Sequence, residues 1–236
     1  MNTATDAPRT LTIDIWSDVM CPWCLVGWGQ LQKGLELLSG ELDADIRWHA
    51  FQLNPDMANE GEDRAAHLAR KYGRSRDDAK SVQGTMQAAA QNAGVTLEYT
   101  GGKDDIPPAM MWNTAAAHRL LIWTLEAKGA AKQTELKLAL FEAHFNHRRA
   151  IGEEEVLIAI ADEVGITHEE AEIALRSDFY AEKVRAEQQA AYDMNVTGVP
   201  AMLVEGRLLI PGAQEPEVYA NALRRVAARI PATPAE

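Results

Sequence analysis

Cys21 and Cys24 are the only two cysteines in the chain, and Pro22 and Trp23 separate them. Two thiols at this spacing can share one disulfide, so that one sulfur attacks a substrate disulfide and the other resolves the mixed disulfide that results. The pair follows a predicted strand at 11–16 and opens a predicted helix. A helix N-terminus favours a thiolate at its first residue, and proline suits the first helical position. We therefore predict a redox pair in which Cys21 attacks and Cys24 resolves.

Two other roles are open to these cysteines. The two cysteines would form a zinc site if His144 and His147 supplied two further ligands, but both histidines fit an ordinary amphipathic helix. Inert buried cysteines are common as well, although the adjacent proline and the helix start disfavour that role here. The sequence therefore predicts no metal at the pair.

A second motif, Gly198-Val199-Pro200, stands at the entry to a late strand. Because proline cannot donate to a central ladder, Pro200 must start the strand, lie at an edge or be cis. On these residues alone the trans form is the commoner case, since only about one X–Pro bond in twenty is cis. A cis bond beside a reactive thiol would offer the backbone of Val199 to an incoming peptide. Gly198 and Val199 are therefore candidate substrate-binding residues.

Two carboxylates near the cysteines are candidates for a proton relay to Cys24. Asp14 lies inside the predicted strand, where an unpaired carboxylate is costly, so burial favours it as the relay. Asp18 stands in the loop before the helix, where capping the helix is the commoner role of aspartate.

Other side chains have an ordinary packing role as the simpler interpretation. Met111 is a candidate for an apolar substrate groove, with a place in a helix core as the alternative. His49 and His118 are interpreted as structural residues of a strand and a helix.

The rest of the chain indicates a divided α/β fold. A second strand at 45–51 completes a strand–helix–strand unit that predicts a parallel pair. A strand–strand–helix unit follows near the C-terminus, at 196–204, 207–210 and 215–229. Between the units we predict only helices, with no strand, at 62–72, 76–93, 109–128, 131–147, 153–164 and 168–193.

Composition narrows the functional classes. The chain has 236 residues and a formal net charge of -12, which argues against nucleic acid and anionic membrane surfaces as partners. No apolar run approaches the ~20 residues of a membrane span. The first residues show no basic stretch followed by an apolar one, so we expect a cytoplasmic protein.

The chain resembles the DsbA-like thioredoxin-fold oxidoreductases, and more narrowly their FrnE-type subgroup. The resemblance is carried first by the Cys-Pro-Trp-Cys motif at 21–24 and the Gly-Val-Pro motif at 198–200. Further landmarks of that subgroup are Ser-Asp-Val-Met at 17–20, Phe-Gln-Leu-Asn-Pro at 51–55, Asn-Thr-Ala-Ala-Ala-His-Arg-Leu at 113–120 and Pro-Gly-Ala-Gln at 211–214. The resemblance implies a thioredoxin core at 10–56 and 191–230, with a large helical insertion at 57–190. It also implies that Cys21 is the nucleophile, Cys24 the resolving cysteine and Pro200 a cis-proline.

The departures from the family pattern concern the redox potential and the reaction. Trp23 stands where strong oxidants of the wider family carry histidine, so we expect a less oxidising pair. Leu25 stands where the subgroup often has tyrosine. A related branch, with hydroxychromene-carboxylate isomerases and kappa-class glutathione transferases, uses serine at the catalytic position. Cys21 argues against that chemistry and leaves glutathione open as a thiol donor.

The sequence therefore predicts a thiol–disulfide oxidoreductase that acts on protein or low-molecular-weight thiols and disulfides. We expect no cofactor beyond the redox disulfide, with glutathione as a possible co-substrate. One alternative is a glutathione-dependent isomerase or transferase of a small aromatic molecule, and another is a non-enzymatic protein that binds peptides or hydrophobic ligands. The direction of the reaction (reduction, oxidation or isomerisation) and the choice between monomer and homodimer stay open at this point.

Overall fold

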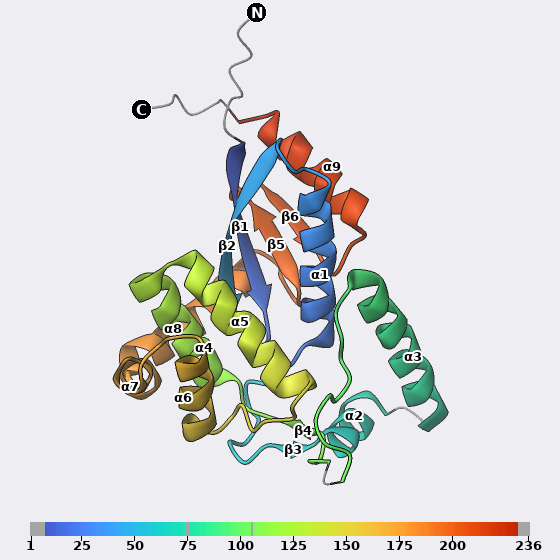
Figure 1. Ribbon diagram of the computed structural model, residues 1–236, viewed down its shortest axis with the longest axis vertical. Helices are drawn as coiled ribbons and strands as arrows, with labels where there is room; N and C mark the ends of the chain where they lie inside the picture. Colours follow the sequence, from blue (N-terminus) through green and yellow to red (C-terminus); the bar gives the residue numbers. More distant parts are fainter. Residues whose placement is uncertain (1–7, 74–75, 105, 231–236) are drawn as a thin grey trace, which may run out of the picture.

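The computed structural model describes residues 8–73, 76–104 and 106–230 and is built around a four-stranded sheet (Figure 1). The strand order is β2-β1-β5-β6, with β1 and β2 parallel and the other neighbours antiparallel. The two predicted halves, strand–helix–strand and strand–strand–helix, are confirmed. Their elements are β1 (Arg9–Ser17), α1 (Pro22–Glu36), β2 (Leu42–Ala50), β5 (Ala201–Val204), β6 (Leu208–Pro211) and α9 (Pro216–Ala227).

Alternation along β1 decides which side chains face each side of the sheet. Leu11, Ile13 and Ile15 are buried in the main core, together with residues of α1 and α9, which lie on one face of the sheet (Figure 1). Trp16 belongs instead to a separate core cluster with Phe51 and residues that follow α8. The cysteines therefore share a face with Ile13 and Ile15.

The segment between the two halves forms a mainly helical insertion. Its main buried cluster consists mostly of leucine, isoleucine and alanine side chains of α4 to α7, and Val19 and Met20 of the loop before the cysteines also belong to it. The helices are α2 (Arg64–Tyr72), α3 (Arg76–Ala93), α4 (Ala115–Lys128), α5 (Ala130–Phe145), α6 (Glu154–Glu163), α7 (His168–Arg176) and α8 (Asp178–Asp193). Helix α8 is continuous through the predicted boundary at 190 and 191.

The prediction that this segment holds no strand is wrong. Two-residue strands β3 (Glu62–Asp63) and β4 (Met110–Met111) pair antiparallel. The helix predicted to begin at residue 109 therefore begins only at Ala115, whose amide donates to the side chain of Asn113 over 2.9 Å.

The helix predicted at 168–193 is in fact two helices, because Ser177 is extended, with φ -81° and ψ 121°. A capping box starts the first of these helices, α7. The Thr167 hydroxyl accepts from the Glu170 amide, and the Glu170 carboxylate accepts from the Thr167 amide.

The insertion docks on the free edge of β2 through side-chain amides. Gln133 of α5 accepts a hydrogen bond from the Trp48 amide over 2.8 Å and donates to the Trp48 carbonyl over 2.7 Å. Gln188 of α8 bonds the amide and carbonyl of Gln52 in the same way, over 2.9 and 3.2 Å. At Trp48 and Gln52 these glutamines take the place of a neighbouring strand and satisfy the backbone amides and carbonyls.

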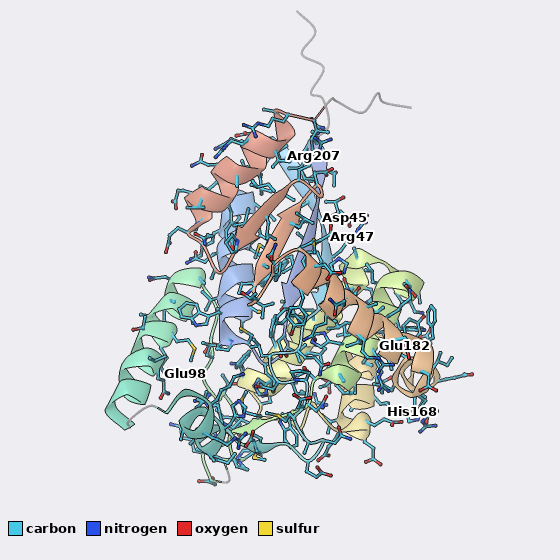
Figure 2. The ribbon with its side chains drawn as sticks, turned by 180° about the vertical axis from the view of Figure 1, so that it is seen from behind. Asp45, Arg47, Glu98, His168, Glu182 and Arg207 are labelled. Atoms are coloured by element: carbon cyan, nitrogen blue, oxygen red, sulfur yellow. The ribbon has the colours of Figure 1, made fainter. Side chains whose placement is uncertain are left out.

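Figure 2 shows the molecule from the side opposite to that of Figure 1. Arg207 of the β5–β6 turn lies in the upper part of the view, whereas His168 and Glu182 of the insertion lie at one side of the lower part. Asp45 and Arg47 lie side by side on β2 and form an ion pair of 2.8 Å. No helix in the described part of the chain is both long and apolar enough to cross a membrane.

A half-buried ion cluster joins β1 and β2 to α8. His49 of β2 contacts Asp14 through Nε2 at 2.8 Å and Glu187 through Nδ1 at 2.9 Å. Its ring also stacks on Trp16. Burial alone would lower the pKa of His49, but the hydrogen bonds to the two carboxylates outweigh it and raise the pKa to about 9.

This cluster makes stability depend on pH. Because the folded pKa of His49 is about 9 and lies above the ordinary 6.5, its contribution is complete below about pH 6.5 and is lost as pH rises through 9. The contribution is at most about 3 kcal/mol. We expect urea unfolding to show a His49→Asn variant well below the wild type in stability near neutral pH, with the difference shrinking at alkaline pH. An equal difference at every pH would contradict this assignment.

Candidate functional site

The cysteine pair lies where β1 ends and α1 begins. Cys21 is the N-cap of α1 in an extended conformation, with φ -83° and ψ 112°, and its amide donates to the Asp18 carbonyl over 3.1 Å. Pro22 occupies the first turn, Trp23 is exposed, and the Cys24 amide donates to the Cys21 carbonyl over 3.0 Å. Both cysteines are free thiols, with exposures of 4% and 1%, so position in the helix, rather than exposure, distinguishes them.

The loop before β5 lies against the first sulfur. The Val199–Pro200 peptide bond is cis, and the Cys21 thiol donates to the Val199 carbonyl over 3.7 Å. Pro200 is buried against α1, where a Cβ on Gly27 would lie 2.9 Å from the proline Cγ. The absence of a side chain at residue 27 therefore allows α1 and this loop to meet at the cysteines.

This close approach yields a prediction for Gly27→Ala. The added methyl group would overlap the rigid proline ring, and overpacking of this kind costs roughly 1–3 kcal/mol. We expect chemical denaturation to show that loss, together with slower reaction of Cys21 with a thiol reagent, because the loop at Val199 must shift. Gly84→Ala is a matched control, since nothing lies within 4 Å of a Cβ built there. A Gly27→Ala protein as stable and as reactive as the wild type would contradict the prediction.

A hollow of about 360 Å³ runs beside the same loop. Gly198, Val199 and Pro200 line it, together with residues of β5 and β6. Met111, by contrast, lies in β4 and packs against the core of the insertion. The structure thus places Val199 against Cys21, with Gly198 before it in the loop, but does not place Met111 against the cysteines.

The two candidate carboxylates have separate positions. Asp14 faces the opposite side of the sheet, where it contacts His49, so the preference for Asp14 as the relay is corrected. Asp18 is fully buried, and its carboxylate accepts from the amides of Met20 over 3.2 Å and Leu53 over 2.8 Å. Burial raises the pKa of Asp18, although these amide bonds oppose the change.

Three further polar residues beneath the cysteines escaped sequence analysis as site residues. The Lys137 ammonium group is fully buried and donates to the Ser17 carbonyl over 3.4 Å. Burial lowers the pKa of Lys137 to about 8, while the negative charges of Cys24 and Asp18 limit the fall. His118 Nε2 lies 4.0 Å from an Asp18 carboxylate oxygen and makes no hydrogen bond within the described residues.

The signal that would have found Lys137 is its place in the helix. It lies on the apolar stripe of α5, one turn from Gln133 and from Phe141, both buried. A lysine on such a stripe is rarely buried unless it has a partner. The hydroxyl of Ser17 and the imidazole of His118 have no comparable sequence signal, because only the fold brings them under the cysteines.

The two thiols ionise as a pair. The hydrogen bond with Cys24 and burial raise the pKa of Cys21 well above the usual range. Burial would also raise the pKa of Cys24, but the hydrogen bond from Cys21, the Lys137 charge and the Ser17 hydroxyl together lower it. Because the two thiols are hydrogen-bonded to each other, the first ionisation belongs to the pair rather than to either residue alone.

The described residues contain no group of three or more His, Cys, Asp and Glu side chains placed to hold a metal ion. His147, one of the two histidines considered as zinc ligands, contacts Glu142 at 3.3 Å. His144 is buried, and burial lowers its pKa to about 4.

The sheet order, a Cys-x-x-Cys pair at the start of the first helix and a cis-proline loop facing it define a protein of the thioredoxin fold with a helical insertion. The family model of the DSBA-like thioredoxin domain matches residues 12–224. The chain belongs to the DSBA-like thioredoxin family.

Individual proteins resemble this chain to different degrees in sequence and in structure. The uncharacterized protein YwbO of Bacillus subtilis is 26% identical over 215 residues, which are 91% of this chain and 96% of YwbO. A probable DsbA oxidoreductase of Streptomyces coelicolor is 27% identical, with a TM-score of 0.79 over 96% of this chain and 93% of that one. The cytosolic disulfide reductase DsbM of Pseudomonas aeruginosa, solved with GSH, is 17% identical, with a TM-score of 0.58 over 93% and 100% of the chains. DsbM therefore shares the fold.

Proposed function

We propose that this protein is a thiol–disulfide oxidoreductase whose redox centre is the Cys21–Cys24 pair. One observation carries the proposal: Cys21 caps the N-terminus of α1 as a free thiol, beside the Val199 carbonyl, with Cys24 one turn further along the helix. The free amides of a helix N-terminus stabilise a thiolate at the first position, and a neighbouring thiol can then complete the exchange.

In the reductive direction, the Cys21 thiolate attacks a substrate disulfide R–S–S–R′. A bond forms between Cys21 and one substrate sulfur, and the other leaves as a thiolate that takes up a proton. Cys24 then loses its proton and attacks Cys21, which releases the second substrate thiol and leaves the Cys21–Cys24 disulfide. The substrate gains two electrons and the pair loses two. A donor dithiol or two molecules of glutathione restore the pair, and the same steps reversed oxidise a substrate.

Asp18 is the group we assign to the proton of Cys24. It is fully buried in the loop that precedes Cys21; the charge of its carboxylate acts on Cys21 and on Lys137, and its backbone hydrogen-bonds to Cys24. A buried carboxylate of this kind can accept a proton while Cys24 attacks. Asp14 is not assigned this role, because its side chain lies on the other face of the sheet.

We further propose that the backbone of Gly198 and Val199 binds the substrate. The Val199 carbonyl already accepts a hydrogen bond from the Cys21 thiol, and Gly198 leaves the preceding position of the loop without a side chain. An extended peptide, or glutathione, can pair with a backbone placed in this way. The presence of GSH with DsbM, a cytosolic reductase of the same fold, supports glutathione as a co-substrate and the cytoplasm as the compartment.

The decisive experiment measures exchange by the purified protein. We expect its cysteines to equilibrate with mixtures of reduced and oxidised glutathione as a single two-electron couple, and the protein to accelerate insulin reduction by dithiothreitol. The fraction of Cys21–Cys24 disulfide at each glutathione ratio would give the reduction potential and so the preferred direction. Cysteines that never pair, with no exchange of either disulfide, would overturn the proposal and favour a binding protein.

A further inference from the structure

The insertion places a buried lysine against the end of β1, four residues before Cys21. Lys137 of α5 is fully buried, and its only hydrogen bond among the described residues is the one to the Ser17 carbonyl, over 3.4 Å. Its ammonium nitrogen lies 5.3 Å from the centroid of the Trp48 ring and 4.9 Å from that of Phe141. A buried ammonium group without an ion-pair partner is costly, so its position calls for negative charge nearby.

The negative groups that act on Lys137 are those of the redox site. They are Cys24, Asp18 and Cys21, in decreasing order of effect. His118 of α4 also faces this compartment but stays neutral, because burial and the charge of Lys137 lower its pKa well below the usual range. Tyr219 of α9, the remaining titratable group under the influence of Cys24, has its pKa raised to about 12 and is therefore neutral as well.

The charges in this compartment change with the redox state. In the disulfide form the sulfurs carry no charge, and Lys137 and Asp18 are the only charged groups of the set. Reduction by two electrons opens the disulfide, and one proton taken up at a sulfur gives a thiol and a thiolate. Lys137 then faces two negative charges, so its ammonium group stabilises the reduced form more than the oxidised form.

We propose that Lys137 is a positioning residue of the redox site, whose buried ammonium group, supplied by the helical insertion, holds the charge of the Cys21–Cys24 thiolate and of Asp18. The proposal rests on the proposed thiol–disulfide function. It gives the insertion a part in setting the redox equilibrium, and it supplies a cation in a chain that has Trp23 between its cysteines.

The test compares thiolate formation, followed by ultraviolet absorbance against pH, in the wild type, Lys137→Met and Asp18→Asn proteins. Loss of the ammonium group should raise the midpoint of the first thiol ionisation by about one to two pH units. Loss of the Asp18 charge should lower that midpoint, because the Lys137 ammonium group then interacts with the thiolate and no longer with a carboxylate. A purely structural role predicts no such opposition between the two variants.

The same proteins are then equilibrated with glutathione. At about pH 8, Lys137→Met should shift the equilibrium toward the protein disulfide by roughly tenfold relative to the wild type. The shift should fade at about pH 5, where the thiols of both proteins are protonated. Lys132→Met is the matched control, since Lys132 is on the same helix but pairs with Glu135 at the surface, and it should change neither readout.

Several outcomes would overturn the inference. A folded Lys137→Met protein with the wild-type midpoint would do so, as would shifts of Lys137→Met and Asp18→Asn in the same direction. If Lys137→Met does not fold, Lys137→Gln takes its place: a higher midpoint supports the inference, and an equal or lower one overturns it. Because thiol ionisation needs no substrate, a wild type that ionises as described but exchanges no disulfide would refute the proposed function and leave the role of Lys137 standing.

Discussion

A Cys24→Ser variant is expected to accumulate as a mixed disulfide through Cys21 when it is mixed with oxidised glutathione. Cys21 keeps its place at the N-terminus of α1 and can still attack, but no second thiol is present to release the adduct. Mass spectrometry of the intact protein should show one glutathione per chain, removed by dithiothreitol. The wild type under the same conditions should instead end as the Cys21–Cys24 disulfide.

Cys21→Ser is the matched control for this experiment. It removes the attacking sulfur and leaves Cys24 one turn inside the helix, so we expect disulfide exchange to fall by a factor on the order of 10³ or more. Equal trapping of glutathione by both single variants would show that the two thiols are interchangeable, contrary to the roles assigned here. A glutathione-dependent isomerase would be nearly indifferent to the loss of Cys24, so the same pair of variants separates the two classes of enzyme.

A Trp48→Ala variant should lose about 3–5 kcal/mol of unfolding free energy. Trp48 is 2% exposed, and its ring packs with Trp28 and Phe141. Its indole nitrogen donates to the Thr134 hydroxyl over 3.0 Å, so the truncation also leaves a contact with α5 unmade. The measurement is guanidinium unfolding followed by circular dichroism.

Trp23→Ala provides the comparison, because Trp23 is 38% exposed and its side chain contributes little to any core. We expect that variant to change stability by less than about 1 kcal/mol. Equal losses in the two variants would contradict the view that Trp48 joins the sheet to the insertion.

Local patterns were sufficient to predict most of the core. Alternating apolar residues mark β1 and β2, and three- and four-residue spacing marks α1 and α9, because these elements each bury one face. The patterns failed where a tertiary contact decides the conformation. The segment before Ala115 has a helical composition, yet it pairs as β4 with β3, and the break at Ser177 lies within good helix-forming sequence.

The candidate site shows the same division. Cys21, Cys24 and the Val199–Pro200 loop were predicted because each belongs to a short contiguous motif and because these motifs resemble those of a known family. Asp14 was wrongly preferred to Asp18 as the relay, because only the folded sheet decides on which face the Asp14 side chain lies. Lys137 was missed because it is separated from the cysteines by more than a hundred positions and only the packing of α5 brings it beneath them.

The glutamine contact between Gln52 and Gln188 has a consequence for the order of folding. These residues are separated by 136 positions, and the pairing of β1 with β5 needs the whole intervening chain to be brought round. Closing so long a loop as disordered chain is slow and entropically unfavourable. If the helices of the insertion pack together first, the two ends of the insertion are held close to each other. Strands β5 and β6 then have only a short distance to cover before β5 pairs with β1.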